Sequence, residues 1–147
     1  MIDVRPANPG DSLVVRELLG QLGYAFTVKE VRARLHLFAE QPADPVLLAT
    51  KDDRGVGLIA MHWTFMLHHS RPVARITALV VCDGARAKGI GRILVDAGAA
   101  LARQAGCDLL ELTTALHRTD AQAFYKALVF TASSLHFVVR LNDEQAL

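Results

Sequence analysis

The stretch that decides the fold is Ile76-Thr77-Ala78-Leu79-Val80-Val81-Cys82-Asp83-Gly84-Ala85-Arg86-Ala87-Lys88-Gly89-Ile90-Gly91. Its first six residues are apolar or β-branched, which favours a buried strand. From Ile90 onward, Leu94, Ala97 and Leu101 fall on one helical face. The sequence therefore predicts a strand, a glycine-containing turn and the beginning of a long helix.

A helix that begins in this way suits an anionic ligand. The N–H groups of its first turn have no acceptor within the helix, and the positive end of the helix dipole lies there. Gly89 and Gly91 let a ligand approach the backbone closely. Arg86, Lys88 and Arg92 add positive charge, and arginine can hold phosphate oxygens with two hydrogen bonds. The segment thus predicts a diphosphate site.

Two familiar nucleotide motifs fit this segment poorly. A P-loop would place Lys and then Ser or Thr after Gly89, but Ile90 and Gly91 follow. A dinucleotide fingerprint would place Gly or Ala at Leu94, although Glu111 lies at a distance suited to a ribose contact. A nicotinamide-dependent oxidoreductase is therefore the weaker alternative.

The pattern Arg86-x-x-Gly89-x-Gly91 after a strand resembles the acetyl-CoA signature of the GNAT N-acetyltransferases. The segment from Asp120 to Phe130 resembles the second motif of that family, a helix with a tyrosine before a Gly-Phe doublet. The resemblance extends from Ile2 to Leu141. Within the family, the runs 65–69 and 112–137 are similar to the aminoalkylphosphonate N-acetyltransferase branch.

Two positions depart from the family pattern. Asp83 stands where the family favours proline, and Val129 stands where it favours glycine before Phe130. A β-branched residue resists a positive φ. We therefore expect a different turn at Val129.

Composition indicates one globular domain over residues 1–147. Hydrophobic residues make up 52% and charged residues 21%, and no apolar run approaches the ~20 residues that span a membrane. No signal peptide is recognisable, so we expect a cytoplasmic protein. The net charge of +1 with scattered basic residues argues against nucleic-acid binding. Cys82 and Cys107 are expected to be free thiols, not zinc ligands.

Periodicity and turn signals give the order of elements. We expect a strand at Ile2–Val4, a helix capped by Asp11 and Ser12 that ends at Gly23, a helix from Thr27 to about Glu40, a hairpin of residues 46–50 and 56–65, a strand at 73–81, a helix from Gly89 to Gly106, a strand at 109–113, a helix at 120–127 and a closing strand at 135–141. This order predicts an α/β domain with a mixed sheet. The resemblance implies the GNAT acyl-CoA N-acyltransferase fold, an α+β arrangement whose central sheet is mixed but mostly antiparallel, with helices on both faces. It also implies that the strands ending near Val81 and Thr113 splay apart.

Acetyl transfer to an amine needs a base, because holding an amine with a pKa near ~10.4 neutral at pH 7 costs roughly 4.6 kcal/mol. Many GNAT enzymes place a glutamate on the strand before the signature, but no Asp or Glu occurs between Val56 and Val81. The remaining candidates are His62, His68 and His69. The choice stays open, with His62 as the catalytic candidate. No metal ligand set is recognisable among them.

The resemblance assigns the other roles. It implies that the backbone N–H of Val81 stabilises the oxygen that gains charge, and that Tyr125 protonates the departing thiolate. Asp120 either approaches the phosphates of the coenzyme or caps its helix. The expected acetyl-CoA contacts are Leu79, Val80, Val81, Arg86, Ala87, Lys88, Gly89, Ile90, Gly91, Arg92, Thr113, Asp120 and Tyr125.

The acceptor is expected to be a small amine that carries negative charge, such as an aminoalkylphosphonate. Its predicted contacts are His68, His69, Arg75 and Arg118. An aminoglycoside, a polyamine or a protein amine is the alternative acceptor, and a non-catalytic acetyl-CoA-binding regulatory module is the alternative function. A homodimer formed through the closing strand is a further expectation.

Overall fold

The computed structural model describes residues 1–142. The chain forms two compact units, Met1–Leu112 and the part that begins at Thr113.

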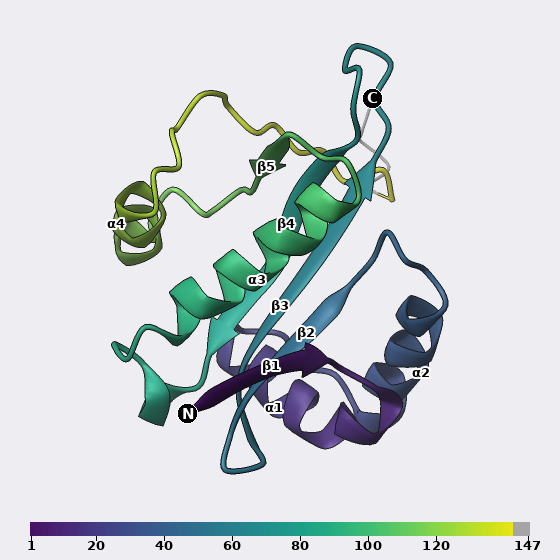
Figure 1. Cartoon of the computed structure of the whole chain (residues 1–147), viewed down its shortest axis with the longest axis vertical. Helices are drawn as coiled ribbons and strands as arrows, with labels where there is room; N and C mark the ends of the chain where they lie inside the picture. Colours follow the sequence, from purple (N-terminus) through teal and green to yellow (C-terminus); the bar gives the residue numbers. More distant parts are fainter. Residues whose placement is uncertain (143–147) are drawn as a thin grey trace. The chain divides into compact units, whose positions relative to one another are not determined.

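The first unit is built on one sheet with the strand order β1-β2-β3-β4-β5 (Figure 1). The strands are β1 (Ile2–Pro6), β2 (Val46–Lys51), β3 (Arg54–Thr64), β4 (Val73–Val81) and β5 (Leu109–Glu111). Neighbouring strands are antiparallel except β4 and β5, which are parallel because α3 (Ile90–Gln104) crosses between them. The prediction of a mixed, mostly antiparallel sheet is confirmed.

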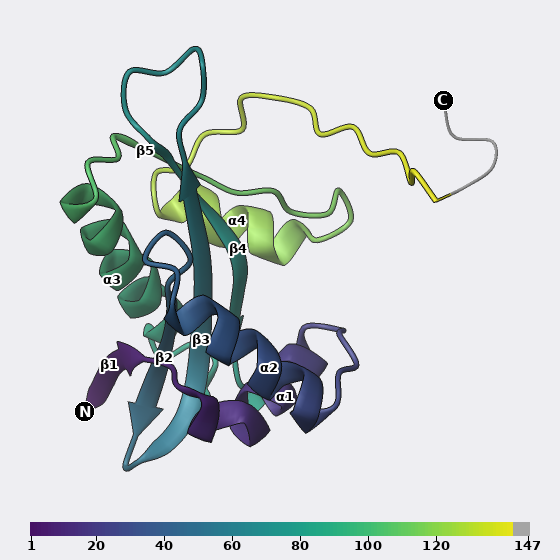
Figure 2. The ribbon, with the colours of Figure 1, turned by 90° about the vertical axis from the view of Figure 1, so that its right-hand side faces the viewer.

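Helices cover both faces of this sheet. Figure 2 shows α3 on one side of the strands and α1 (Ser12–Gln21) and α2 (Val28–Ala39) on the other. Val15 and Leu18 of α1 and Val31 and Leu35 of α2 form one buried cluster with Leu48, Leu58 and Val80 of the sheet. Leu58 and Val80 therefore point to the face that α1 and α2 cover.

The predicted capping box at the start of α2 is present. The Glu30 N–H donates to Thr27 Oγ1 at 3.1 Å, and the Thr27 N–H donates to Glu30 Oε1 at 3.4 Å. The predicted cap of α1 by the Asp11 side chain is wrong. Its carboxylate instead accepts the Asn8 N–H and two hydrogen bonds from Arg5, each at 2.8 Å. Hydrogen bonds between Asp11 and the charged Arg5 guanidinium are stronger than a cap on the neutral N–H groups at the start of α1.

The hairpin between β2 and β3 turns at Asp52 and Asp53, which have φ of 49° and 62°. Two left-handed residues form the tight turn whose twist matches antiparallel strands. Gly55, expected in the turn, lies in β3. A Cβ at Gly55 would come within 2.7 Å of Val14 Cγ2, so this glycine allows α1 to pack closely.

The second unit contains α4 (Thr119–Ala127), which confirms the predicted helix. The predicted closing strand at 135–141 is wrong, because residues 130–140 form no strand and Leu135 and Phe137 are exposed. Alternating apolar residues form a strand only beside a partner that satisfies their backbone groups. The described part of this unit has no such strand, so the expected dimer contact has no structural support here.

Val129 follows α4 with a φ of 65°. The Phe130 N–H donates to the Tyr125 carbonyl oxygen at 3.0 Å, and the Val129 N–H donates to that of Lys126 at 3.1 Å. These bonds require a left-handed residue after the helix. The expectation of a different turn at Val129 is therefore wrong.

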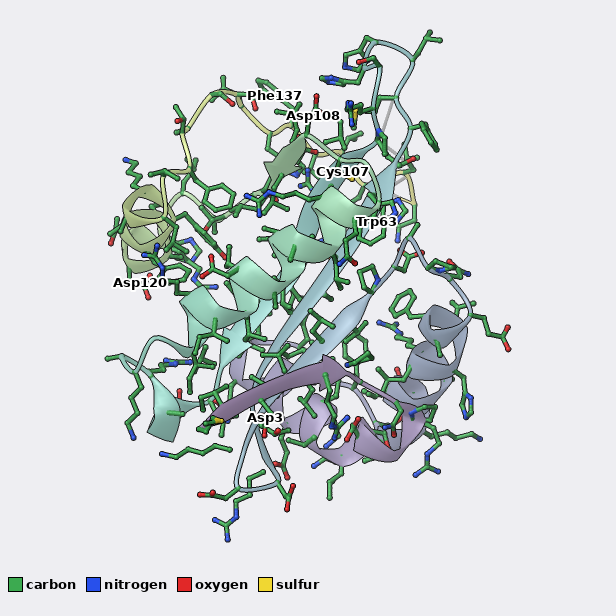
Figure 3. All side chains as sticks on the ribbon, in the orientation of Figure 1. Asp3, Trp63, Cys107, Asp108, Asp120 and Phe137 are labelled. Carbon is green, nitrogen blue, oxygen red and sulfur yellow. The ribbon has the colours of Figure 1, made fainter. Side chains whose placement is uncertain are left out.

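Cys82 and Cys107 are free thiols, as expected. Cys107 is buried just past the C-terminal end of α3 (Figure 3), and burial raises the pKa of its thiol. Within residues 1–142, no helix has both the length and the apolar content needed to cross a membrane.

Candidate active site

One edge of β4 is left open by β5. The two strands pair only from Val73 to Arg75, where Arg75 lies beside Glu111. β4 then continues to Val81, whereas β5 ends at Glu111 and not at the predicted Thr113. The strands therefore part after Arg75, which leaves the segment from Ile76 to Val81 without a β5 partner.

The backbone groups of β4 alternate along this segment. The Cys82 N–H donates to the Val56 carbonyl oxygen at 2.9 Å, so Cys82 faces β3. Because successive residues point to opposite edges, Val80 also faces β3, whereas Leu79 and Val81 face the open edge. The Val81 carbonyl oxygen accepts Nε of Arg86 at 3.1 Å. Leu79 and Val81 thus offer N–H groups at this edge, while the backbone of Val80 lies in the ladder.

The loop after β4 is held by its own side chains. Arg86 contacts Asp83 Oδ1 at 2.9 Å in addition to the Val81 carbonyl, so its guanidinium folds the loop back onto the strand. The Asp83 N–H donates to Gln21 Oε1 at 2.9 Å. A proline has no such N–H, so the departure from the family pattern at Asp83 supplies a contact to α1.

The N-terminus of α3 has the geometry of an anion site. Gly89 precedes the helix with a φ of 79°, and the first helical hydrogen bond runs from the Ile93 N–H to its carbonyl oxygen. The N–H groups of Ile90, Gly91 and Arg92 therefore have no acceptor within the helix. A Cβ at Gly89 would meet no heavy atom within 4 Å. This open cradle of donors fits phosphate groups of a ligand.

Two further features shape this cradle. Ala87 also takes a left-handed φ of 62°, and Lys88 is exposed. Successive N–H groups in such a backbone converge on an anion. Gly57 of β3 lies under the helix, because a Cβ there would come within 2.9 Å of Leu94 Cδ1 and 3.2 Å of Ile90 Cγ2. The role of Gly57 depends on the packing of α3 and has no sequence signal.

A polar row crosses the sheet on the face covered by α1 and α2. His62 alternates with Leu58 on that face, and Nδ1 of His62 lies 2.7 Å from Asp44 Oδ1. Arg75 lies opposite His62 in register, and its NH1 lies 3.3 Å from Glu111 Oε1. No carboxylate belongs to β3 between Val56 and Thr64 or to β4, as the sequence indicated. Asp44 and Glu111 nevertheless reach this face from neighbouring segments.

The two predicted catalytic groups of this unit lie far apart. Val81 is opposite Gly57 and His62 is opposite Arg75, so the stretch of β3 from Gly57 to His62 separates them by about 17 Å at ~3.3 Å per residue. They cannot both touch one reacting atom. Leu79, opposite Ile59, is the open-edge residue nearer to His62.

His68 and His69 lie in the loop between β3 and β4. Their ring centroids are 4.5 Å apart, and the His69 N–H donates to the Met66 carbonyl oxygen. Arg71 in the same loop donates to the Gly106 carbonyl oxygen at 3.4 Å. This loop and His62 are at the same end of the sheet, the end opposite Val81.

The remaining predicted residues belong to the second unit. Tyr125 is half-buried, with ring centroids 5.2 Å from Phe124 and 5.6 Å from Phe130. Burial raises the pKa of its phenol, and the charge of Arg118 offsets part of that rise. Arg118 occupies the N-cap position of α4, and Asp120 lies in the first helical turn (Figure 3). Thr113 lies at the start of this unit.

Metal-type side chains do not gather in groups of three or more anywhere in residues 1–142. The candidate site of the first unit therefore consists of backbone donors at the open edge and at the start of α3, together with the polar row.

Comparison with known proteins gives concordant results. The sequence profile described as the acetyltransferase (GNAT) family matches residues 13–130. The aminoalkylphosphonate N-acetyltransferase of Salmonella typhimurium is 36% identical over 107 residues, which cover 71% of this chain and 70% of that protein.

Solved structures show the same fold. An aminoglycoside N-acetyltransferase in complex with CoA matches with a TM-score of 0.87 and 19% identity, over 97% of this chain and 96% of that one. A transcriptional regulator from Bacillus halodurans matches with a TM-score of 0.86 and 23% identity, over 96% of this chain and all of that one (100%). The chain therefore belongs to the acetyltransferase (GNAT) family and is an N-acetyltransferase that takes its acetyl group from acetyl-CoA.

Proposed function

We propose that this enzyme acetylates the primary amine of a small acceptor that also carries an anionic group, of the aminoalkylphosphonate kind. The observation that carries the proposal is the 36% identity to the aminoalkylphosphonate N-acetyltransferase over most of both chains. Near one end of the sheet, Arg75 supplies a positive charge and the imidazoles of His68 and His69 can donate hydrogen bonds, which is consistent with an anionic acceptor.

The polar row supports an acceptor with charges of both signs. Arg75 and Glu111 lie side by side on neighbouring strands, with His62 opposite Arg75. A zwitterion that combines an ammonium group with a phosphonate can pair with both side chains. A polyamine or an aminoglycoside carries several positive charges and is disfavoured by the arginine.

The residues have the following roles in this proposal. Acetyl-CoA supplies an activated acetyl thioester. The N–H groups of Ile90, Gly91 and Arg92 hold its phosphates, with Lys88 as a cationic neighbour. One backbone N–H at the open edge, that of Val81 or that of Leu79, stabilises the oxygen that gains negative charge, and Leu79 is the nearer of the two to His62.

Two proton transfers complete the reaction. His62 accepts the proton that the acceptor amine releases, and the separation of His62 from the open edge requires that a chain of water molecules carry it. Tyr125 gives its phenolic proton to the departing thiolate and regains one from solvent. The amide and the thiol are the products.

A panel of amines tests the proposal. Thiol release from acetyl-CoA is measured with 2-aminoethylphosphonate, ethanolamine, spermidine and an aminoglycoside. We expect the phosphonate to have the highest kcat/KM, and ethanolamine, which matches its length but lacks the anion, to fall well below it. A preference for spermidine or the aminoglycoside would contradict the proposed acceptor class.

The variant Arg75→Gln separates binding from catalysis. We expect KM for 2-aminoethylphosphonate to rise by roughly 10-fold or more, because a charged hydrogen bond contributes about 1.5–3 kcal/mol. The KM for acetyl-CoA is expected to stay unchanged. Binding of acetyl-CoA without acetylation of any amine would instead favour a regulatory module.

A further inference from the structure

We infer that Asp44 is the positioning residue for His62: it holds the imidazole with its Nδ1 protonated, so that Nε2 is the atom that receives the proton of the amine. The inference rests on the proposed role of His62 and adds a residue that the sequence did not point to. It begins from the 2.7 Å contact between Nδ1 of His62 and Oδ1 of Asp44.

The backbone places these two side chains together. The Met61 N–H donates to the Pro45 carbonyl oxygen, and the Trp63 N–H donates to the Ala43 carbonyl oxygen, each at 3.0 Å. These bonds extend the antiparallel pairing beyond β2 and bracket Asp44 opposite His62. Residues opposite each other between two such bonds form the closely spaced type of pair, with side chains on one face.

Asp44 is fixed from its other side as well. Its N–H donates to the Gln41 carbonyl oxygen at 3.0 Å, which closes a turn before Pro45. The side chain of Asp44 is only 20% exposed, whereas that of His62 is 45% exposed. The carboxylate is therefore the more buried of the two groups, and the imidazole remains partly accessible to solvent.

The chemistry follows from the hydrogen-bonding capacity of each group. An ionised carboxylate can only accept a hydrogen bond, so the Nδ1 of His62 must carry the hydrogen. In a neutral imidazole, Nε2 then holds the free lone pair. When Nε2 takes a proton, the ring becomes a cation beside the Asp44 carboxylate, and it later releases that proton to solvent.

The charged groups that face His62 agree with this arrangement. Arg75 lies opposite on β4, but its guanidinium contacts Glu111 on β5. Asp44 faces the imidazole from the segment before β2. The carboxylate of Asp44 is thus the group that contacts the ring, while the positive charge of Arg75 is balanced by another partner.

The decisive measurement is the tautomer of His62 in the free, full-length protein. Long-range ¹H–¹⁵N correlation spectra, assigned with His62→Gln, distinguish a protonated Nδ1 from a protonated Nε2. We expect the Nδ1–H form in the wild type and its loss in Asp44→Ala. A protonated Nε2 in the wild type would overturn the inference, whether or not any amine is acetylated.

Kinetics give the second readout. We expect Asp44→Ala to lower kcat by about 10²-fold, the effect of misplacing a catalytic group by about 1 Å, with an unchanged KM for acetyl-CoA. Asp44→Asn keeps the shape of the side chain but can turn its N–H₂ toward Nδ1 and favour the wrong tautomer, so it should also lower kcat. Asp3→Asn, at an exposed position of β1, is the matched control. Asp44→Ala combined with His62→Gln should be no slower than His62→Gln alone.

These outcomes separate the two proposals. Folded Asp44→Ala and Asp44→Asn proteins with wild-type kcat would show that the contact only joins the start of β2 to β3, which overturns the inference. Thermal melting confirms that each variant is folded. If no amine is acetylated, the proposed acceptor class fails, and the tautomer alone decides the role of Asp44.

Discussion

Gly89 and Ala87 both hold the left-handed backbone that turns the chain into α3, with φ of 79° and 62°. For a residue with a side chain, this conformation costs roughly 1–2 kcal/mol. Ala87 incurs this cost because it has a side chain, whereas Gly89 has none and does not. Strained residues of this kind are common at ligand sites, because the donors they orient are useful only when fixed in advance.

The substitution Gly89→Ala separates these contributions. A Cβ at Gly89 meets no atom of the protein, so the loss of stability should be only the backbone cost of about 1–2 kcal/mol. The methyl group would project where a phosphate approaches, so the Kd for acetyl-CoA should rise by more than 10-fold.

Gly84→Ala is the control within the same loop. Gly84 has equally open surroundings and no left-handed φ, so both its Tm and its Kd should match the wild type. Calorimetric titration and thermal melting measure the two quantities. Equal affinities of Gly89→Ala and Gly84→Ala would contradict the phosphate cradle.

A second prediction for a single residue concerns the phenol of Tyr125. Burial raises the pKa of its phenol above its usual value of 10.0, so the phenol stays protonated across any assay between about pH 6 and 9. If it protonates the thiolate, Tyr125→Phe should lower kcat by roughly 10²–10⁴-fold with little change in the Kd for acetyl-CoA.

The chain offers a matched control for Tyr125. Its other tyrosine, Tyr24, is exposed and follows α1, so Tyr24→Phe should retain full activity. Stopped-flow measurement of thiol release detects the difference. A Tyr125→Phe enzyme with wild-type kcat would leave Tyr125 as a packing residue beside Phe124 and Phe130.

At the scale of elements, α3 is positioned by two contacts with the sheet that need glycine. Gly57 on β3 lies under the start of the helix, near Ile90 and Leu94. Gly98 of the helix lies against Met61, where an added Cβ would come within 2.5 Å of its sulfur. Both sites are close-packed, so an added methyl group should cost about 1–3 kcal/mol at either position.

Their effects on the ligand should differ. Gly57→Ala pushes the first turn of α3 away from β3 and therefore displaces the N–H groups of the phosphate cradle. We expect it to weaken acetyl-CoA binding at least 10-fold. Gly98→Ala disturbs the middle of the helix and should lower Tm by a similar amount with a much smaller change in affinity. Equal losses of affinity would argue against a preformed cradle.

The contact between Arg5 of β1 and Asp11, just before α1, predicts that the stability of the fold depends on pH. The two hydrogen bonds from Arg5 lower the pKa of Asp11 in the folded protein. The ionised carboxylate therefore stabilises the fold above the pKa of the unfolded state, about 3.9, and this contribution is lost as pH falls through the lower folded pKa.

Arg5→Gln removes that contribution. Its Tm should lie below the wild type at pH 7, and the difference should shrink as pH falls from about 5 to 3. Arg16→Gln, at an exposed position on α1, should show no such convergence. A constant difference across this range would mean that Arg5 acts through packing and not through the Asp11 carboxylate.

The elements could be predicted from sequence wherever the signal is local. Thr27 and Glu30 predict the capping box of α2. Gly106 predicts the end of α3, where it has a φ of 92°. Alternation at Leu135 and Phe137 wrongly predicted a closing strand, because a strand depends on a partner far away in sequence. The roles of Asp44 and Gly57 could not be predicted for the same reason: Asp44 depends on its pairing with β3, and Gly57 depends on the packing of α3 against β3.

At the scale of the whole molecule, the net charge is only +1. The long-range field of the protein is therefore weak, and attraction of a polyanionic ligand must be local. Arg86 contacts Asp83, and Arg92 lies 4.0 Å from Asp96. Lys88 has no ion pair within residues 1–142, so this side chain is the cation most available to a phosphate.

Lys88→Gln and Lys29→Gln test whether charge acts locally. Both lower the formal net charge by one, but Lys29 is exposed on α2, far along the chain from the α3 cradle. We expect Lys88→Gln to raise the Kd for acetyl-CoA about 5-fold at 0.1 M salt, or ~1 kcal/mol, and Lys29→Gln to leave it unchanged. At 1 M salt, where the Debye length falls from ~10 to ~3 Å, the Lys88→Gln effect should shrink while the cost of Gly89→Ala persists, because backbone amides act at contact. If both lysine variants bind like the wild type at low salt, the phosphates are held by backbone donors alone.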